Sequence, residues 1–158
     1  MWLHKFKRYF WRGKNGATTV EFALAAVILL TVVFGILEMS LALFTFHLLS
    51  EAAREGTRYA QVRGNTCAVN GASCTASAAQ IQSFVQNLGF PGIDPAKMTV
   101  SATYSAYPAG STCSPNANCA NPGNLVTVTV VYAFPLSIPF VRFTTLSMTS
   151  TSAMVISQ

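Results

Sequence analysis

The residues best placed to do chemistry form a short segment at the start of an apolar stretch. Residues 16–22 read GATTVEF and stand between a basic leader and a long uncharged run. A cut after Gly16 would make Ala17 the new amino terminus and Glu21 the fifth residue of the shortened chain.

Glu21 is a carboxylate at the start of the expected helix. The helix dipole favours a carboxylate there, by roughly 0.3–1 kcal/mol at exposed sites. In apolar surroundings a carboxylate needs a cation, and a neighbouring subunit's amino terminus is one. The alternative is that Glu21 merely reaches towards the membrane interface.

A second acid, Glu38, interrupts the apolar run. It lies 17 residues beyond Glu21, a rise of roughly 26 Å along a helix, which puts it close to the outer face of a membrane. Acids within membrane spans usually have a partner, so Glu38 is a candidate for contact with another subunit. The alternative is an interfacial acid hydrated among the headgroups. We interpret His47, near or beyond that interface, as a histidine without a functional role.

The cysteines invite a zinc interpretation, but their spacing argues against it. All four follow the apolar run. Six residues separate Cys67 from Cys74, and five residues separate Cys113 from Cys119. Structural zinc sites usually contain a tighter Cys-x2-4-Cys hook. In an exported domain disulfides persist, and four cysteines allow three connectivities. We favour the local pairs Cys67–Cys74 and Cys113–Cys119.

Catalytic groups are scarce in the rest of the chain. Beyond Gly64 the only charged side chains are Asp94, Lys97 and Arg142, and there is no histidine. Paired carboxylates, a Ser-His arrangement and a phosphate-binding glycine loop are all missing from this part of the sequence. We therefore expect no enzyme, no cofactor and no metal site.

Charge is concentrated before the apolar run. The segment 1–16 carries five of the ten basic residues, and no acid precedes Glu21. The remaining residues balance to a formal charge of zero, so the net charge of +5 belongs to the leader and is poor evidence for nucleic-acid binding. A basic flank beside an apolar span keeps that flank in the cytoplasm. The pattern predicts a lipid bilayer as partner and an exported carboxyl-terminal part.

The elements that carry these residues begin with one long helix. Residues 22–50 contain one charged residue, Glu38, and would form a helix of roughly 44 Å, longer than a hydrocarbon core of ~30 Å. The stretch EAAREGTRYAQVRG continues it, with two ion pairs at i,i+3 spacing, Glu51–Arg54 and Glu55–Arg58. We expect one helix from about Thr18 to Arg63.

One side of this helix carries mostly small residues: Thr31, Gly35, Glu38, Ala42, Thr45, Ala53, Gly56 and Ala60. Such a stripe lets another helix approach closely. The alternative is that its outer half packs on the protein's own domain.

The remaining residues predict a small α+β domain. Residues 77–88 have the apolar spacing of a short helix, which Gly89 ends. Apolar and polar residues alternate from Met98 to Ser105 and from Val126 to Phe134, and residues 146–157 resemble a third strand. Residues 107–124 have the composition of a loop. The predicted fold is a long transmembrane helix, a short second helix and a three-stranded antiparallel sheet.

The segment 13–64 resembles a known family. The basic leader, Gly16 and Glu21 resemble a type IV prepilin processing site, and the helix with its AAREG exit is similar to the TadE family of the tight-adherence (Tad/Flp) pilus machinery. The resemblance implies a pilin-like minor pilin or pseudopilin, cleavage between Gly16 and Ala17 by a prepilin peptidase, and an assembly role for Glu21. It also implies other pilin or Tad assembly subunits as partners.

These observations predict three parts: a leader at 1–16, a helix at 17–63 whose membrane span covers about 22–46, and an exported domain at 64–158. The location would be a bacterial inner membrane, with the amino terminus cytoplasmic and the domain periplasmic or on the pilus or cell surface. Two alternatives remain open. One is a secreted protein whose signal peptide is cut near Ala42; the other is an uncleaved, membrane-tethered binding module.

Overall fold

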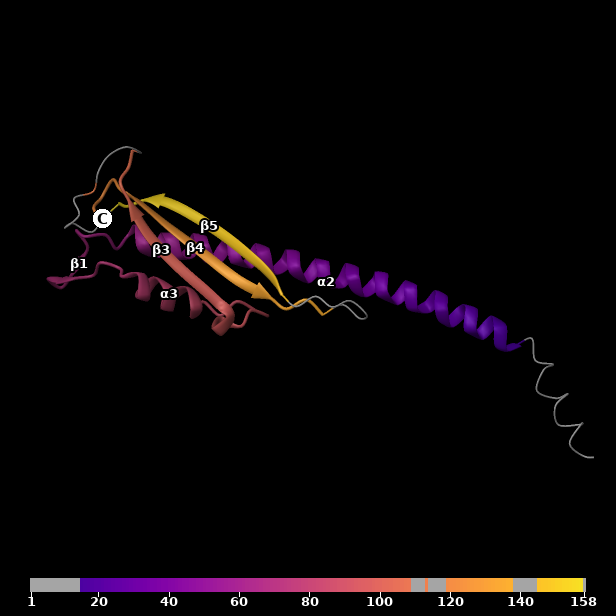
Figure 1. Ribbon diagram of the computed structural model, residues 1–158. Coiled ribbons are helices and arrows are strands. Elements are labelled where there is room, and N and C mark those ends of the chain that lie inside the picture. The colour runs from indigo at the N-terminus through magenta and orange to yellow at the C-terminus, as the bar shows by residue number, and fades with distance from the viewer. Residues whose placement is uncertain (1–14, 109–112, 114–118, 138–144, 158) are drawn as a thin grey trace, which may run out of the picture. The chain divides into compact units, whose positions relative to one another are not determined.

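The structure, a computed structural model, describes residues 15–108, 113, 119–137 and 145–157. The chain divides into two units, one of Met1–Met39 with Ser137–Phe143 and one of Ser40–Leu136 with Thr144–Gln158. The long helix α2 spans Asn15–Gln61 and supplies residues to both (Figure 1).

In the first unit the described structure is almost entirely α2. From Val20 to Leu37 its large apolar side chains are exposed, and none of the residues from Gly16 to Met39 is buried. The segment Gly16–Gln61 is long and apolar enough to cross a membrane, with a mean hydropathy of 2.6 in its most apolar window. A long apolar helix without a buried face needs an apolar environment from outside the chain.

The second unit is an α+β domain. Its sheet has the antiparallel order β3-β4-β5, formed by β3 (Met98–Ser105), β4 (Leu125–Phe134) and β5 (Leu146–Val155). Helix α3 (Ala78–Gln86) packs beside β3, and a short 3-10 helix, η1 (Pro95–Lys97), leads into that strand. Two very short strands, β1 (Ala68–Val69) and β2 (Ala72–Ser73), pair separately.

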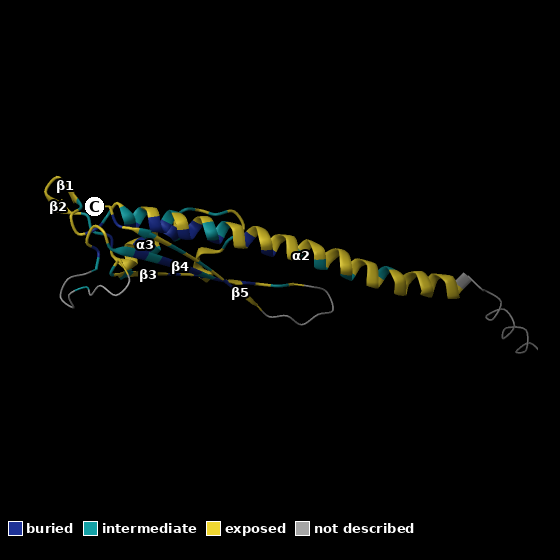
Figure 2. Ribbon diagram, turned by 90° about the horizontal axis from the view of Figure 1, so that it is seen from above, coloured by how far each residue is buried: buried dark blue, intermediate teal, exposed yellow. Residues whose placement is uncertain are grey.

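The core lies between the sheet and the two helices. The inward residues of β4 are buried (Val126, Val128, Val130, Tyr132 and Phe134) and the carboxyl-terminal part of α2 and α3 cover them (Figure 2). The opposite face of the sheet is uncharged and carries hydroxyl groups in register, since Ser101, Thr129 and Thr151 are neighbours across the three strands. Alternation along each strand thus separates core from surface.

The predicted fold class is confirmed: a long apolar helix, a short second helix and a three-stranded antiparallel sheet. Element bounds differ slightly, because α2 runs from Asn15 to Gln61 rather than from about Thr18 to Arg63. Helix α3 begins at a capping box in which the Ser77 and Gln80 side chains each accept from the other's backbone N–H. The β1–β2 hairpin lies in a segment for which the sequence predicted no helix or strand.

Candidate functional site

The proposed processing bond lies in the first turn of α2. Gly16 and Ala17 are both exposed, and a Cβ added at Gly16 would meet nothing within 4 Å. The fold of this chain therefore does not require glycine at position 16. A requirement for glycine there would have to come from an enzyme that acts on the segment.

The two acids in the first half of α2, Glu21 and Glu38, do not come together. Glu21 is exposed and Glu38 half-buried, and 17 residues of the same helix separate them, roughly 26 Å of rise. Within the described part of the chain neither acid makes an ion pair. Any contact that compensates their charge must come from elsewhere, and another chain is one source.

The exposed side of α2 changes character after Phe46. Four large apolar side chains before this point are exposed: Leu41, Leu43, Phe44 and Phe46. In the rest of α2, which ends at Gln61, no large apolar side chain is exposed. Charged residues follow Phe46, and the two predicted ion pairs are confirmed: Arg54 Nη1 lies 2.9 Å from Glu51 Oε1, and Arg58 Nη1 lies 3.3 Å from Glu55 Oε1. The change from apolar to charged is typical of a helix that emerges from a membrane into water.

The outer half of the small-residue stripe packs on the protein's own domain. Ala42, Thr45, Ala53, Gly56 and Ala60 are all buried in the second unit. A Cβ added at Gly56 would lie 2.7 Å from Val85 Cγ2 and 3.2 Å from Val128 Cγ1. Of the two interpretations of the stripe, packing on the domain is therefore the correct one for this half.

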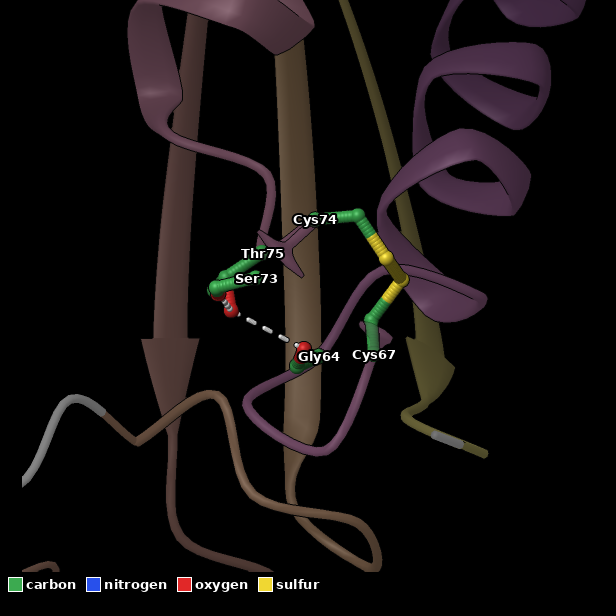
Figure 3. The surroundings of a disulfide bond; sticks show 5 residues. All are labelled: Gly64, Cys67, Ser73, Cys74 and Thr75. Carbon is green, nitrogen blue, oxygen red and sulfur yellow. Dashed lines mark hydrogen bonds between the residues drawn. A yellow bond between two sulfur atoms is a disulfide. The ribbon is translucent and has the colours of Figure 1, made fainter. Parts of the chain in front are cut away.

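All four cysteines form disulfides, Cys67–Cys74 and Cys113–Cys119, with Cα–Cα distances of 5.2 and 5.5 Å. The first closes the β1–β2 hairpin (Figure 3). The Thr75 hydroxyl donates to the Gly64 carbonyl at 3.1 Å, and the Ala76 N–H donates to the Arg63 carbonyl at 2.9 Å. The disulfide-closed hairpin is thus anchored at the carboxyl-terminal end of α2.

The sequence contained a signal for this hairpin. Asn70 and Gly71 have φ of 51° and 80°, as a two-residue hairpin turn with both central residues left-handed requires. An Asn-Gly pair between two short strand-forming segments is the strongest short-range sequence signal for such a turn.

A shallow depression of about 360 Å³ lies between α2 and α3. Its lining contains no acid or base: Tyr59, Ala79, Gln80, Ser83, Phe84 and Asn87. The Tyr59 and Phe84 rings stack with centroids 4.2 Å apart, and the Arg63 guanidinium lies 3.8 Å from the Tyr59 ring centre. These contacts fasten α3 to the end of α2.

Fold and site together define a small α+β domain carried on a long helix with an exposed apolar face. The model of the family described as "TadE-like protein" matches residues 16–58, a little over a quarter of the chain. The resemblance to that family is therefore confirmed for this segment, which is almost the whole of α2. No curated protein and no solved structure matches the chain.

Proposed function

We propose that this chain is a TadE-like minor pilin or pseudopilin that acts in assembly of a Tad/Flp type IV pilus, for adhesion or secretion. One observation carries the proposal. The family match begins at Gly16 and ends at Arg58, so it begins at the proposed cleavage point and covers the apolar helix and its charged exit. The segment that resembles the family thus includes the whole exposed apolar part of α2.

The proposed placement follows from this helix. Residues about 22–46 span the bacterial inner membrane, the basic leader 1–16 stays in the cytoplasm, and the domain 64–158 lies in the periplasm or on the pilus or cell surface. The charge of the leader supports this orientation. The two disulfides support an exported domain, because such bonds persist outside the cytoplasm.

Processing and assembly use the start of the helix. A prepilin peptidase removes the leader after Gly16, and Glu21 then meets the new amino terminus of a neighbouring pilin or Tad subunit. Glu38 contacts a partner nearer the outer membrane face. The exposure of the Gly16–Ala17 bond supports access by a peptidase. The role is structural, through helix packing and display of the domain, rather than catalytic.

One alternative is secretion after a cut near Ala42. Ala42 is only 4% exposed, and α2 continues through it to Thr45 and Leu49, which also pack in the domain. A cut after Ala42 would remove a residue that belongs to the core of the exported part. This burial favours a helix that stays attached.

The acid Glu21 provides the test of assembly. In the variant Glu21→Gln the amide keeps the size of the side chain but cannot neutralise a neighbour's amino terminus in an apolar setting. We expect the variant to be made, inserted and cleaved normally, yet to abolish piliation and surface attachment. Glu51→Gln is the matched control, because Glu51 is exposed and forms only a surface ion pair with Arg54.

Piliation is measured by microscopy and attachment by a surface-binding assay, with cleavage checked in the same strains. Normal pili with a cleaved Glu21→Gln protein would remove Glu21 from the mechanism and favour the tethered binding module.

A further inference from the structure

The domain and the exposed apolar side chains share one stretch of α2. Within residues 40–46, Leu43 is 61% exposed and Phe44 52% exposed. The flanking residues Ala42 and Thr45 are only 4% and 6% exposed. One side of the helix at this level is bare and apolar, and the other is covered by the chain's own domain. The end of the domain that covers Ala42 therefore reaches the same level as the exposed apolar face.

Strand β5 identifies that end of the domain. The Thr57 hydroxyl on α2 lies 3.3 Å from the carbonyl oxygen of Ser152 on β5. Helix and strand run in the same direction here (Figures 1 and 2). Leu146 precedes Ser152 by six residues, about 20 Å of strand, which corresponds to about 13 residues of helix before Thr57. Leu146 is thus roughly level with Phe44.

A count of residues places this level in a bilayer. A hydrocarbon core of ~30 Å takes about 20 helical residues, so a span that starts at Phe22 leaves the core near Leu41. The headgroup layer adds a few more residues on each side, since core and headgroups together measure ~40–45 Å. Residues 42–46 then lie in the outer interfacial layer, and Leu146 lies beside them.

The chemistry of this end of the sheet suits such a layer. The register places Met98, Tyr132 and Met148 side by side, so the start of β3, the end of β4 and the start of β5 share one end. Leu146 there is 44% exposed. The preceding η1 helix brings the exposed side chain of Lys97 to the same end, where its Nζ lies 3.9 Å from Asp94 Oδ2. Met98, Tyr132 and Met148 are themselves buried, so Leu146 is the apolar side chain that this end exposes. An exposed apolar side chain with a nearby lysine suits a protein surface that contacts lipid headgroups.

We propose that this end of the domain, at Leu146 and η1, rests in the outer interfacial layer of the phospholipid bilayer. The inference depends on the membrane anchoring proposed above.

Tryptophan fluorescence tests the contact directly. The only two tryptophans, Trp2 and Trp11, lie in the leader, and both are replaced by phenylalanine in the full-length protein. Single tryptophans are then introduced as Leu146→Trp, Val155→Trp and Phe34→Trp. Val155 is the matched control, because it is 39% exposed and lies at the other end of the same strand. Phe34→Trp reports the apolar part of α2.

The proteins are reconstituted in phosphatidylcholine vesicles whose acyl chains carry bromine, which quenches nearby indole. If Leu146 lies in the interfacial layer, Leu146→Trp should lose a roughly twofold larger fraction of its fluorescence than Val155→Trp. The quenching of Leu146→Trp should also be stronger with bromine near the headgroup than with bromine near the end of the acyl chain. Phe34→Trp should be quenched strongly at the deeper position. Thr145→Trp, at the exposed neighbouring residue, replaces Leu146→Trp if the latter fails to fold.

Two results would contradict the account, in different ways. If Phe34→Trp is quenched while Leu146→Trp and Thr145→Trp match Val155→Trp, the domain is held clear of the lipid and the inference is wrong, but the anchor stands. If Phe34→Trp is not quenched either, α2 does not enter the bilayer and the proposed function fails with it.

Discussion

Gly56 shows how strongly one residue constrains the packing of the long helix. It is buried where α2 meets α3 and β4, with Val85 and Val128 next to the position of a Cβ. Both neighbours are β-branched and therefore stiff about χ1. A glycine in a helix interior normally costs stability relative to alanine, by about 1 kcal/mol. Here the close approach of the two elements explains why a larger residue is unsuitable.

We predict that Gly56→Ala lowers the free energy of unfolding of the domain. Overpacking costs about 1–3 kcal/mol and the gain in helix propensity offsets about 1 kcal/mol, so the net loss should reach up to about 2 kcal/mol. Gly35→Ala is the matched control in the same helix, because a Cβ there meets nothing within 4 Å. Resistance to proteolysis on heating compares the two variants. If Gly56→Ala were as stable as the parent protein, the side chains of Val85 and Val128 would have to move away from the added methyl group at little cost in free energy.

At the scale of elements, the long helix, the short helix and the three strands of the sheet could be predicted from the sequence, but the partner of the small-residue stripe could not. The hairpin was missed although the sequence carries a signal for it. Alternation of apolar residues in β4 gave both the strand and its buried face, because a strand has only two faces. Small residues on a helix permit close approach by any partner, so their spacing does not distinguish another subunit from the chain's own sheet. The pair Asn70-Gly71 is the sequence signal for the two-residue turn of the hairpin.

The disulfide-closed hairpin leads to a prediction about redox chemistry. In the exported protein, thiol labelling without reductant should find no free cysteine, and peptide mapping should recover Cys67 joined to Cys74 and Cys113 joined to Cys119. Replacement of Cys67 and Cys74 by serine should lower the free energy of unfolding by about 2–3 kcal/mol, because the unfolded chain gains freedom. Four reactive thiols, or a tightly bound zinc ion, would refute the pairing.

Tyr104 joins β3 to the segment before α3. Its hydroxyl donates to the Ala76 carbonyl at 2.8 Å, and burial raises the pKa of the phenol above its ordinary value of 10.0. The fold therefore favours the neutral phenol. Stability from this group is present below pH 10 and is lost as the pH rises through the raised pKa.

We predict that Tyr104→Phe costs about 1 kcal/mol at neutral pH, from the lost hydrogen bond. The variant should also lose less stability than the parent between neutral pH and pH values above 10. Denaturant unfolding followed at several pH values measures both effects. An identical pH dependence in parent and variant would show that Tyr104 is not the group responsible.

At the scale of the whole molecule, the apolar part of α2 continues into a segment of the same helix on which the domain packs. The site at the helix start stays a prediction, which rests on a basic leader, Gly16 and Glu21 before an uncharged run. The roles of Glu21 and Glu38 stay predictions, because their proposed partners belong to other chains. The position of the domain on the helix needed the structure, since it depends on which residues of α2 are buried.

The central claim is that this helix is the processed anchor of a pilin-like subunit. The intact mass and amino-terminal sequence of the protein extracted from its native membrane test that claim most directly. We predict a chain that begins at Ala17, retains all of residues 17–158, and carries two disulfides. A chain that begins at Leu43 would contradict the account in favour of a secreted protein, and one that still carries residues 1–16 would favour an uncleaved, tethered module.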